Sequence, residues 1–129
     1  MTDEELKSVL QSYEKALESF RKALKQSKTE WVRDSAIQRF EYTFDLAWKS
    51  IKRFAQKEGI ECHSPLQSFR TALKLAWIED NGIWLDMRDD RNRTSHTYNE
   101  STAEEIYSHL QKYEIKFTNL LNCLKQLPE

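Results

Sequence analysis

The chain has 129 residues, of which only 2 are glycine and 2 are proline, while 32% are Asp, Glu, Lys or Arg. The 20 basic residues nearly cancel the 21 acidic ones, so the formal net charge is -1 and the general attraction of a strongly basic protein for nucleic acid is excluded. The scarcity of glycine and proline favours long helices with short connections, and the length is that of one domain covering residues 1–129.

Three features of the sequence bear on where the protein works. Cys62 and Cys123 are two thiols without the spacing of metal ligands. The N-terminal Met-Thr-Asp-Glu-Glu lacks the basic and apolar regions of a signal peptide. No apolar run approaches the roughly 20 residues of a membrane span. We therefore expect a cytoplasmic protein with reduced thiols, no membrane contact, no metal site and no cofactor.

Two long amphipathic helices are predicted in the first half of the chain. Apolar residues recur at alternating steps of four and three from Asp3 to about Gln26, with acids at the start and lysines at the end. After a joint at 27–30, a second such run reaches about Glu58, and Gly59 ends it. A further apolar strip on the second helix indicates neighbours on two sides, and another subunit is one candidate.

Two shorter helices are predicted next. Ser64-Pro65-Leu66-Gln67 combines a serine cap with a proline in the first turn, so it begins a helix, which we expect to end near Ile78. Asn81-Gly82 marks the following turn. A fourth helix then runs from Ile83 to about Ser95.

A long fifth helix completes the predicted fold. Ser101-Thr102-Ala103-Glu104-Glu105 contains two overlapping capping boxes, apolar residues then recur by threes and fours, and Pro128 ends the helix. The chain has no internal repeat and no long linker. This order of elements predicts an all-α protein, an antiparallel up-and-down bundle of about five helices.

The segment Arg91-Asn92-Arg93-Thr94-Ser95-His96-Thr97-Tyr98 contains groups that phosphate chemistry needs. Arginine offers a fixed fork of donors for a phosphate, and histidine, with an ordinary pKa of about 6.5, exchanges a proton near neutrality. On an uninterrupted helix Arg91 and His96 lie roughly 140° apart, whereas Asn92 and His96 share a face. A helix that ends just before His96 would let it turn back toward Arg91, so we place a candidate site at this helix end.

The residues alone leave a purely structural interpretation of this segment open. Arg91 can pair with neighbouring acids on a solvated surface, and exposed pairs of this kind are common. His96 can serve as an ordinary helix cap, and Tyr98 can close the joint as a partly buried aromatic. The acids available to Arg91 on its own helix are Asp86, Asp89 and Asp90.

Other polar groups are weaker candidates. Glu41 and Asp45 lie one turn apart and in principle suit a divalent cation, but they are more typical of a solvated flank in which Asp45 faces Lys49. Neither His63 nor His109 has a partner at the spacing of metal ligands.

The chain resembles the HEPN superfamily, and within it the helical partners of minimal nucleotidyltransferases, also described as nucleotidyltransferase substrate-binding proteins and as HepT-type toxins. A bare Arg-x4-His pattern occurs by chance, but its combination with several helical blocks is specific. The resemblance covers Ile37-Gln38-Arg39-Phe40-Glu41-Tyr42-Thr43-Phe44-Asp45-Leu46-Ala47-Trp48-Lys49, Ser64-Pro65, Trp84-Leu85-Asp86-Met87 and the segment Arg91–Tyr98.

The resemblance implies a metal-independent endoribonuclease toxin in which Arg91 and His96 form the active site, with the Asn92 amide in support. It further implies a homodimer that pairs across the helices bearing the motif, and a cognate minimal nucleotidyltransferase that silences the toxin by attaching AMP to Tyr98. RNA is the implied substrate, and DNA is not expected as a partner. The chain lacks the Gly-Ser and paired-aspartate signature of a nucleotidyltransferase, so we do not expect it to be one.

Two other functions stay open at this point. The first is a non-catalytic binding module that presents a substrate to the nucleotidyltransferase, and the second is a structural bundle in which the motif is a relic. A catalytic His96 is essential for RNA cleavage, whereas in a binding module its replacement alters only the activity of the partner.

Overall fold

The computed structural model describes residues 3–80 and 82–128, and its regular elements over these ranges are all helical. The predicted all-α bundle with five α-helices is confirmed. None of these helices is long and apolar enough to cross a membrane. The elements are α1 (Asp3–Leu24), α2 (Glu30–Lys57), α3 (Pro65–Lys74), α4 (Ile83–Arg93), the short 3-10 helix η1 (Thr94–His96) and α5 (Glu100–Lys125).

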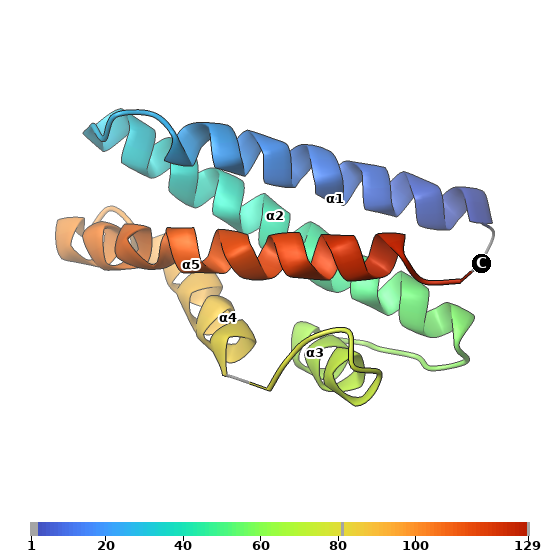
Figure 1. The fold of residues 1–129 in the computed structure, drawn as a ribbon. Helices are drawn as coiled ribbons and strands as arrows, with labels where there is room; N and C mark the ends of the chain where they lie inside the picture. Colours follow the sequence, from blue (N-terminus) through green and yellow to red (C-terminus); the bar gives the residue numbers. More distant parts are fainter. Residues whose placement is uncertain (1–2, 81, 129) are drawn as a thin grey trace.

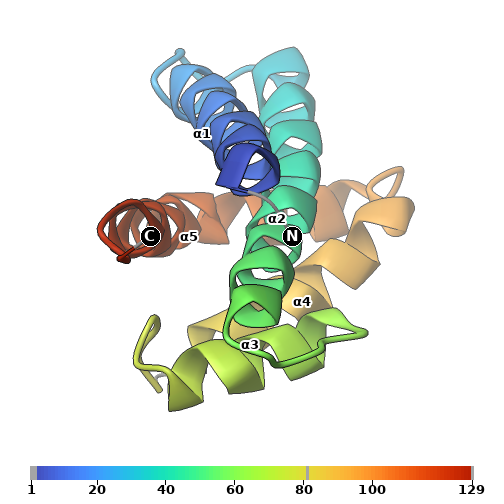
Figure 2. The ribbon, with the colours of Figure 1, turned by 90° about the vertical axis from the view of Figure 1, so that its right-hand side faces the viewer.

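The three long helices make up most of the bundle, and α2 lies at its centre. α1 runs antiparallel to α2, whereas α5 runs in the same general direction as α2 (Figures 1 and 2). The short helices α3 and α4 carry the chain back and together take the place of a fourth long helix. α2 contacts every other element, which accounts for the apolar strips on two of its sides.

An aromatic cluster forms the centre of the core. The fully buried Phe40 stacks on Tyr113, with ring centroids 5.4 Å apart and planes at 24°. Phe20 and Phe117 pack edge to face at 6.0 Å, and the Tyr13 hydroxyl donates to the Phe117 carbonyl at 2.6 Å. Such pairs add to the free energy gained by burial of the rings. The cluster therefore packs α1, α2 and α5 against one another, and α4 packs on α2 and α5.

Helix α3 ends at Lys74, four residues earlier than the predicted end near Ile78. Ala76 adopts a left-handed conformation (φ 61°), and the Trp77 and Ala76 amides donate to the Ala72 and Leu73 carbonyls. This is a Schellman ending, in which glycine is the usual left-handed residue. Because alanine stands there instead, the sequence carried no stop signal, and the turn serves to bury Trp77.

The first turn of α5 is capped differently from the prediction. The side chain of Asn99, rather than that of Ser101 or Thr102, accepts hydrogen bonds, and its donors are the Ser101 and Thr102 amides at 3.0 and 3.2 Å. Asparagine is as good a cap as serine, and it stands two residues before the first predicted capping box.

The other predicted helix ends agree with the structure where it is described. Gly59 follows the end of α2 with φ 81°, and the Ser64 hydroxyl accepts from the Gln67 amide at 3.2 Å. Gly82, also left-handed with φ 74°, is the N-cap residue of α4. Asn81, the other residue of the predicted turn, lies outside the described residues.

Candidate functional site

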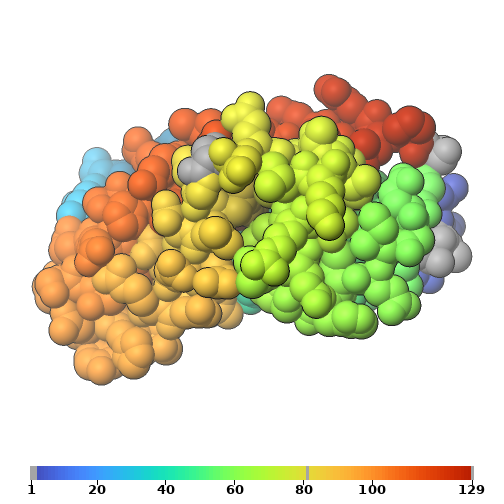
Figure 3. All heavy atoms as spheres, turned by 90° about the horizontal axis from the view of Figure 1, so that it is seen from below, coloured from blue at the N-terminus to red at the C-terminus, as the bar shows by residue number. Residues whose placement is uncertain are grey.

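The Arg91–Tyr98 segment lies at one end of the molecule, where α4 ends and α5 begins (Figures 1 and 3). The α-helix ends at Arg93, so His96 belongs to η1 rather than to α4, as a site at a helix end requires. Thr94 is buried, and its hydroxyl donates to the Arg91 carbonyl at 2.7 Å. The Thr97 hydroxyl donates in turn to the Thr94 carbonyl at 3.1 Å. These short-range bonds hold the backbone in a tight turn.

Arg91 reaches across to α2. Its Nε and Nη2 atoms each donate to one oxygen of Asp45 at 3.2 Å, and Nη1 donates to the Thr94 hydroxyl at 3.2 Å. Glu41 lies 3.6 Å from Nη1. Two-bond arginine–carboxylate pairs are the geometrically specific kind. The Asp45 hydrogen bonds, as the largest cause, raise the pKa of Arg91 above its ordinary value.

These contacts correct two of the interpretations drawn from the sequence. The purely structural alternative paired Arg91 with acids on its own helix, and Glu41 with Asp45 was expected to form a solvated flank in which Asp45 faces Lys49. Instead, two carboxylates of α2 bind the guanidinium. The Arg91 and Asp45 side chains are 31% and 36% exposed, so solvent still reaches the pair. An arginine has five N–H donors, and the three donated to Asp45 and Thr94 leave one on each of Nη1 and Nη2.

His96 and Tyr98 face solvent next to each other. Their ring centroids are 6.0 Å apart with planes at 74°, and Tyr98 is 85% exposed. Tyr98 is therefore not a partly buried aromatic that closes the joint. Asn92 is also exposed. Within the described residues, no hydrogen bond or ion pair joins Arg91 to His96, so their convergence on one phosphate stays a prediction.

Asp90, the residue before Arg91, points toward α5 and not toward α2. Asp90 is buried against α5, where it accepts hydrogen bonds from Tyr113 and His109, and Arg93 also donates to it. Sequence reasoning missed this cluster and found no partner for His109. One signal was available, since His109 and Tyr113 are one turn apart on α5 and can face a single acid.

A second cluster fixes the start of α5. Arg33 is a buried arginine of α2, and it forms ion pairs with Glu100 and Glu104 in the first turns of α5 and with Asp34. The hydrogen bond to Glu100, as the largest cause, raises the pKa of Arg33 above its ordinary value. The segment 94–99, most of which is exposed, is thus held at both ends. Before it, Arg91 of α4 binds Asp45 of α2, and after it, Arg33 of α2 binds the first turns of α5.

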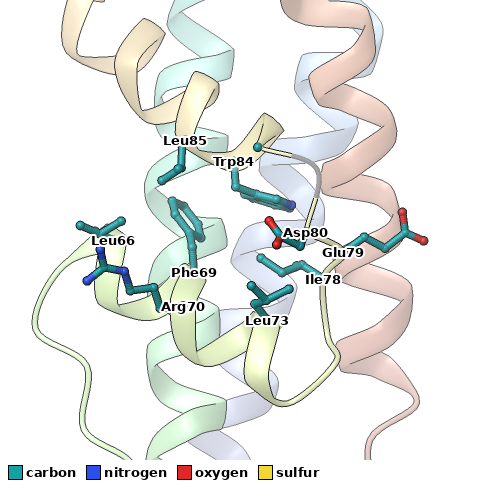
Figure 4. Close-up of a pocket in the computed structure, with 10 residues that line it drawn as sticks. Leu66, Phe69, Arg70, Leu73, Ile78, Glu79, Asp80, Trp84 and Leu85 are labelled. Atoms are coloured by element: carbon teal, nitrogen blue, oxygen red, sulfur yellow. The ribbon is translucent and has the colours of Figure 1, made fainter.

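A cavity of about 120 Å³ lies between α3 and the first turn of α4, at the opposite end of α4 from Arg91. Figure 4 shows Phe69 of α3 beside Trp84 of α4 in its lining, and their ring centroids are 5.1 Å apart. Its other lining residues are Leu66, Arg70, Leu73, Ile78, Glu79, Asp80, Gly82 and Leu85. Arg91, Asn92, His96 and Tyr98 do not line this cavity. In the described part of the chain, no group of three or more His, Cys, Asp or Glu residues is placed to hold a metal ion.

The fold and the exposed end segment define a class, namely an all-α bundle that presents an Arg-x4-His-x-Tyr motif where a short helix ends. Comparison with known families identifies the group within that class. Residues 8–126 match the family described as nucleotidyltransferase substrate binding protein like, and the chain belongs to this family.

Individual relatives agree with this assignment. A Haemophilus influenzae protein named "Probable ribonuclease HepT" is 34% identical over 96 residues, which are 70% of this chain and 66% of that protein's length. A crystal structure of a Thermus thermophilus protein, 37% identical, superposes with a TM-score of 0.84 over 88% of this chain and 99% of that chain. A Haemophilus influenzae structure, described as revealing the fold of a substrate binding domain of a nucleotidyltransferase, is 28% identical. Its TM-score is 0.71, over 94% of this chain and 97% of that chain.

Proposed function

We propose that the protein is a metal-independent endoribonuclease and the toxin of a toxin–antitoxin pair, with Arg91 and His96 as catalytic residues and Asn92 in support. The observation that carries the proposal is the position of His96. It is exposed on the tight turn that follows Arg91, and Asp45 of α2 holds the Arg91 guanidinium in place. The relative named as a ribonuclease supports the same activity. A family named for nucleotidyltransferases supports a nucleotidyltransferase as partner.

The proposed reaction uses the ribose 2′-OH as nucleophile. His96 accepts the 2′-OH proton while that oxygen forms a bond to phosphorus, and the bond from phosphorus to the 5′-oxygen breaks. The products are a 2′,3′-cyclic phosphate and a 5′-hydroxyl, whose oxygen takes up a proton from an acid. Arg91 donates to the phosphoryl oxygens through the N–H groups that Asp45 and Thr94 do not use, and thereby stabilises the charge that develops there.

The need for an acid leads to a homodimer. One imidazole cannot serve as base and acid at the same moment, whereas a two-fold pair that brings two motifs together supplies both. The exposure of His96 and Tyr98 at one end of the bundle supports this arrangement, because a second copy can approach that end without disturbing the core.

Tyr98 is proposed as the control point. A cognate minimal nucleotidyltransferase attaches AMP to its hydroxyl and so acts as the antitoxin. An exposed phenol with its ring 6.0 Å from that of His96 is accessible to such an enzyme. The added phosphate brings bulk and negative charge beside His96, and it repels the phosphate of an RNA substrate.

A second candidate function rests on the family description and on the relative described as a nucleotidyltransferase substrate binding domain. In this alternative, the exposed segment is a surface that presents a substrate to the nucleotidyltransferase. His96 then takes no part in RNA cleavage.

Cleavage of a labelled RNA in EDTA separates the two functions. The wild type is compared with Arg91→Ala and His96→Ala. The matched controls are Arg88→Ala, one turn earlier on α4, where Arg88 lies 3.5 Å from Asp89, and His63→Ala, an exposed histidine 3.8 Å from Glu61.

The nuclease proposal expects cleavage by the wild type and both controls, with 2′,3′-cyclic phosphate ends, and at least about a hundredfold loss in the two site variants. Absence of cleavage by the wild type, or equal cleavage by all five proteins, contradicts it. If RNA stays intact while His96→Ala changes the activity of the nucleotidyltransferase partner, the second function is favoured.

A further inference from the structure

Asp90 is a nearly buried carboxylate with three donors. Its side chain is 5% exposed. Oδ2 accepts from the Tyr113 hydroxyl at 2.5 Å and from His109 Nδ1 at 2.7 Å, while Oδ1 accepts from Arg93 Nη1 at 3.2 Å. Two of the donors belong to α5 and one to the last turn of α4. The carboxylate therefore joins the two helices at a single point.

This arrangement is energetically costly to assemble and hence specific. Removing a carboxylate from water is strongly unfavourable unless charged or strong hydrogen-bond donors surround it, and the donors must be correctly placed. Tyr113 is well fixed, because its ring stacks on Phe40 in the core. Burial, followed by the hydrogen bond to Asp90, raises the pKa of Tyr113 well above its ordinary value. Its hydroxyl thus stays protonated and continues to donate to Asp90 throughout the physiological range.

Consecutive residues hold α4 to two different helices. Asp90 binds α5, and Arg91 binds Asp45 of α2. Arg93 adds a second link to α5, with Nη2 at 2.8 Å from Glu105. The last turn of α4 is therefore fixed in both position and rotation, and η1 leaves from this turn. The direction in which η1 carries His96 follows from these contacts.

We propose that Asp90, held by Tyr113 and His109, is a positioning residue that sets where His96 lies relative to Arg91. The consequence for catalysis rests on the proposed nuclease function, whereas the effect on the position of His96 does not. Asp90 touches no substrate in this account, and it acts only through the turn that follows it.

Two variants and two matched controls test this inference. Asp90→Asn keeps the size of the side chain and removes its charge, and Tyr113→Phe removes one hydroxyl from a ring that stays packed. The control for the first is Asp89→Asn, an adjacent carboxylate that is 64% exposed and lies 3.5 Å from Arg88. The control for the second is Tyr107→Phe, a half-buried tyrosine of α5 whose hydroxyl has no hydrogen bond within the described residues.

The first readout is the position of the His96 ring signal in a carbon–proton NMR spectrum. The protein has three histidines, so the His96 signal is identified by its loss in His96→Ala. We expect it to shift in Asp90→Asn and Tyr113→Phe and to stay in place in both controls. Because Tyr113→Phe changes no charge, a shift there reports geometry rather than the field of the carboxylate. If Asp90→Asn does not fold, Tyr113→Phe alone decides.

The second readout is RNA cleavage, measured well below the unfolding temperature of each variant. We expect kcat to fall roughly tenfold to a hundredfold while KM changes by less than about twofold, since a small displacement of a catalytic group impairs the chemical step. Unchanged His96 signals in the folded variants, or a wild-type kcat in both, overturn the inference. If the wild type does not cleave RNA but the His96 signal shifts as expected, the nuclease proposal fails and the positioning role stands.

Discussion

Arg91 of α4 and Asp45 of α2 meet in a two-bond pair, with Nε and Nη2 each 3.2 Å from a carboxylate oxygen. The contact joins residues 46 positions apart, and it turns the guanidinium toward the α2 side of α4. In the proposed mechanism Asp45 thus orients the Arg91 guanidinium toward a phosphate. It also uses two of the N–H donors of that guanidinium, one on Nε and one on Nη2.

Replacing Asp45 by asparagine is expected to weaken catalysis more than stability. The variant keeps one acceptor oxygen but loses the charge and one of the two bonds, so Arg91 becomes mobile and RNA cleavage falls by roughly tenfold. The free energy of unfolding drops by only about 0.5 to 1 kcal/mol, because the pair is about one-third exposed. Cleavage kinetics and urea unfolding measure the two effects.

Glu41→Gln provides the graded comparison for this prediction. Glu41 lies 3.6 Å from Nη1 and makes no hydrogen bond to it, so both effects should be smaller than those of Asp45→Asn. Faster cleavage by Asp45→Asn would contradict the orienting role and would indicate that Asp45 masks the arginine.

Tyr98→Phe is expected to prevent AMP attachment while it leaves RNA cleavage intact. The phenol oxygen is the proposed acceptor, and the ring that contacts His96 is preserved. Co-expression with the nucleotidyltransferase followed by intact-mass analysis detects the added AMP. Tyr42→Phe serves as control, because Tyr42 is 37% exposed and its hydroxyl is hydrogen-bonded to Ser19 at 2.8 Å. AMP on the Tyr98→Phe protein, or none on the wild type, argues against the proposed site.

The proposed dimer predicts an activity that depends on protein concentration. If two copies of His96 share the roles of base and acid, cleavage per mole of chain must fall when dilution separates the subunits. Sedimentation velocity over the same concentration range gives the midpoint of dissociation, which should coincide with the midpoint of activity loss. A monomer that retains full activity rules out the shared site.

The fold was largely predictable because it depends on patterns that repeat along the chain. The apolar spacing in α1, α2 and α5 locates their buried faces, and Gly59 and Ser64 are local signals for a helix end and a helix start. The exceptions are ends that use an uncommon residue, such as Ala76 in a position where glycine is usual.

The contacts of the candidate site were much less predictable, because they depend on which helices meet. Arg91 has three acids within five positions on its own helix, but it binds Asp45, which becomes a neighbour only when α4 crosses α2. The burial of Asp90 follows likewise from the packing of α4 on α5. Periodicity predicts which face of a helix is buried and does not predict its partner, so the motif was found while the residues that hold it were not.

The buried tyrosines predict a loss of stability in alkaline solution. Burial raises the pKa of both Tyr13 and Tyr113, and Arg21 partly offsets the effect at Tyr13. In the unfolded chain both hydroxyls ionise near pH 10, so above that pH the unfolded state binds fewer protons than the folded state. The free energy of unfolding is therefore unaffected by these groups below about pH 10. At higher pH it falls by up to about 1.4 kcal/mol per pH unit for each tyrosine.

Urea unfolding at several pH values above 10 tests this slope against two single variants. Tyr13→Phe and Tyr113→Phe should each be less stable at neutral pH, by roughly 1 to 2 kcal/mol for the lost buried hydrogen bond, yet lose stability less steeply above pH 10. Their curves should thus converge on that of the wild type as the pH rises. Curves that stay parallel to it would show that these hydroxyls ionise equally in both states, and the account of their burial would then be wrong.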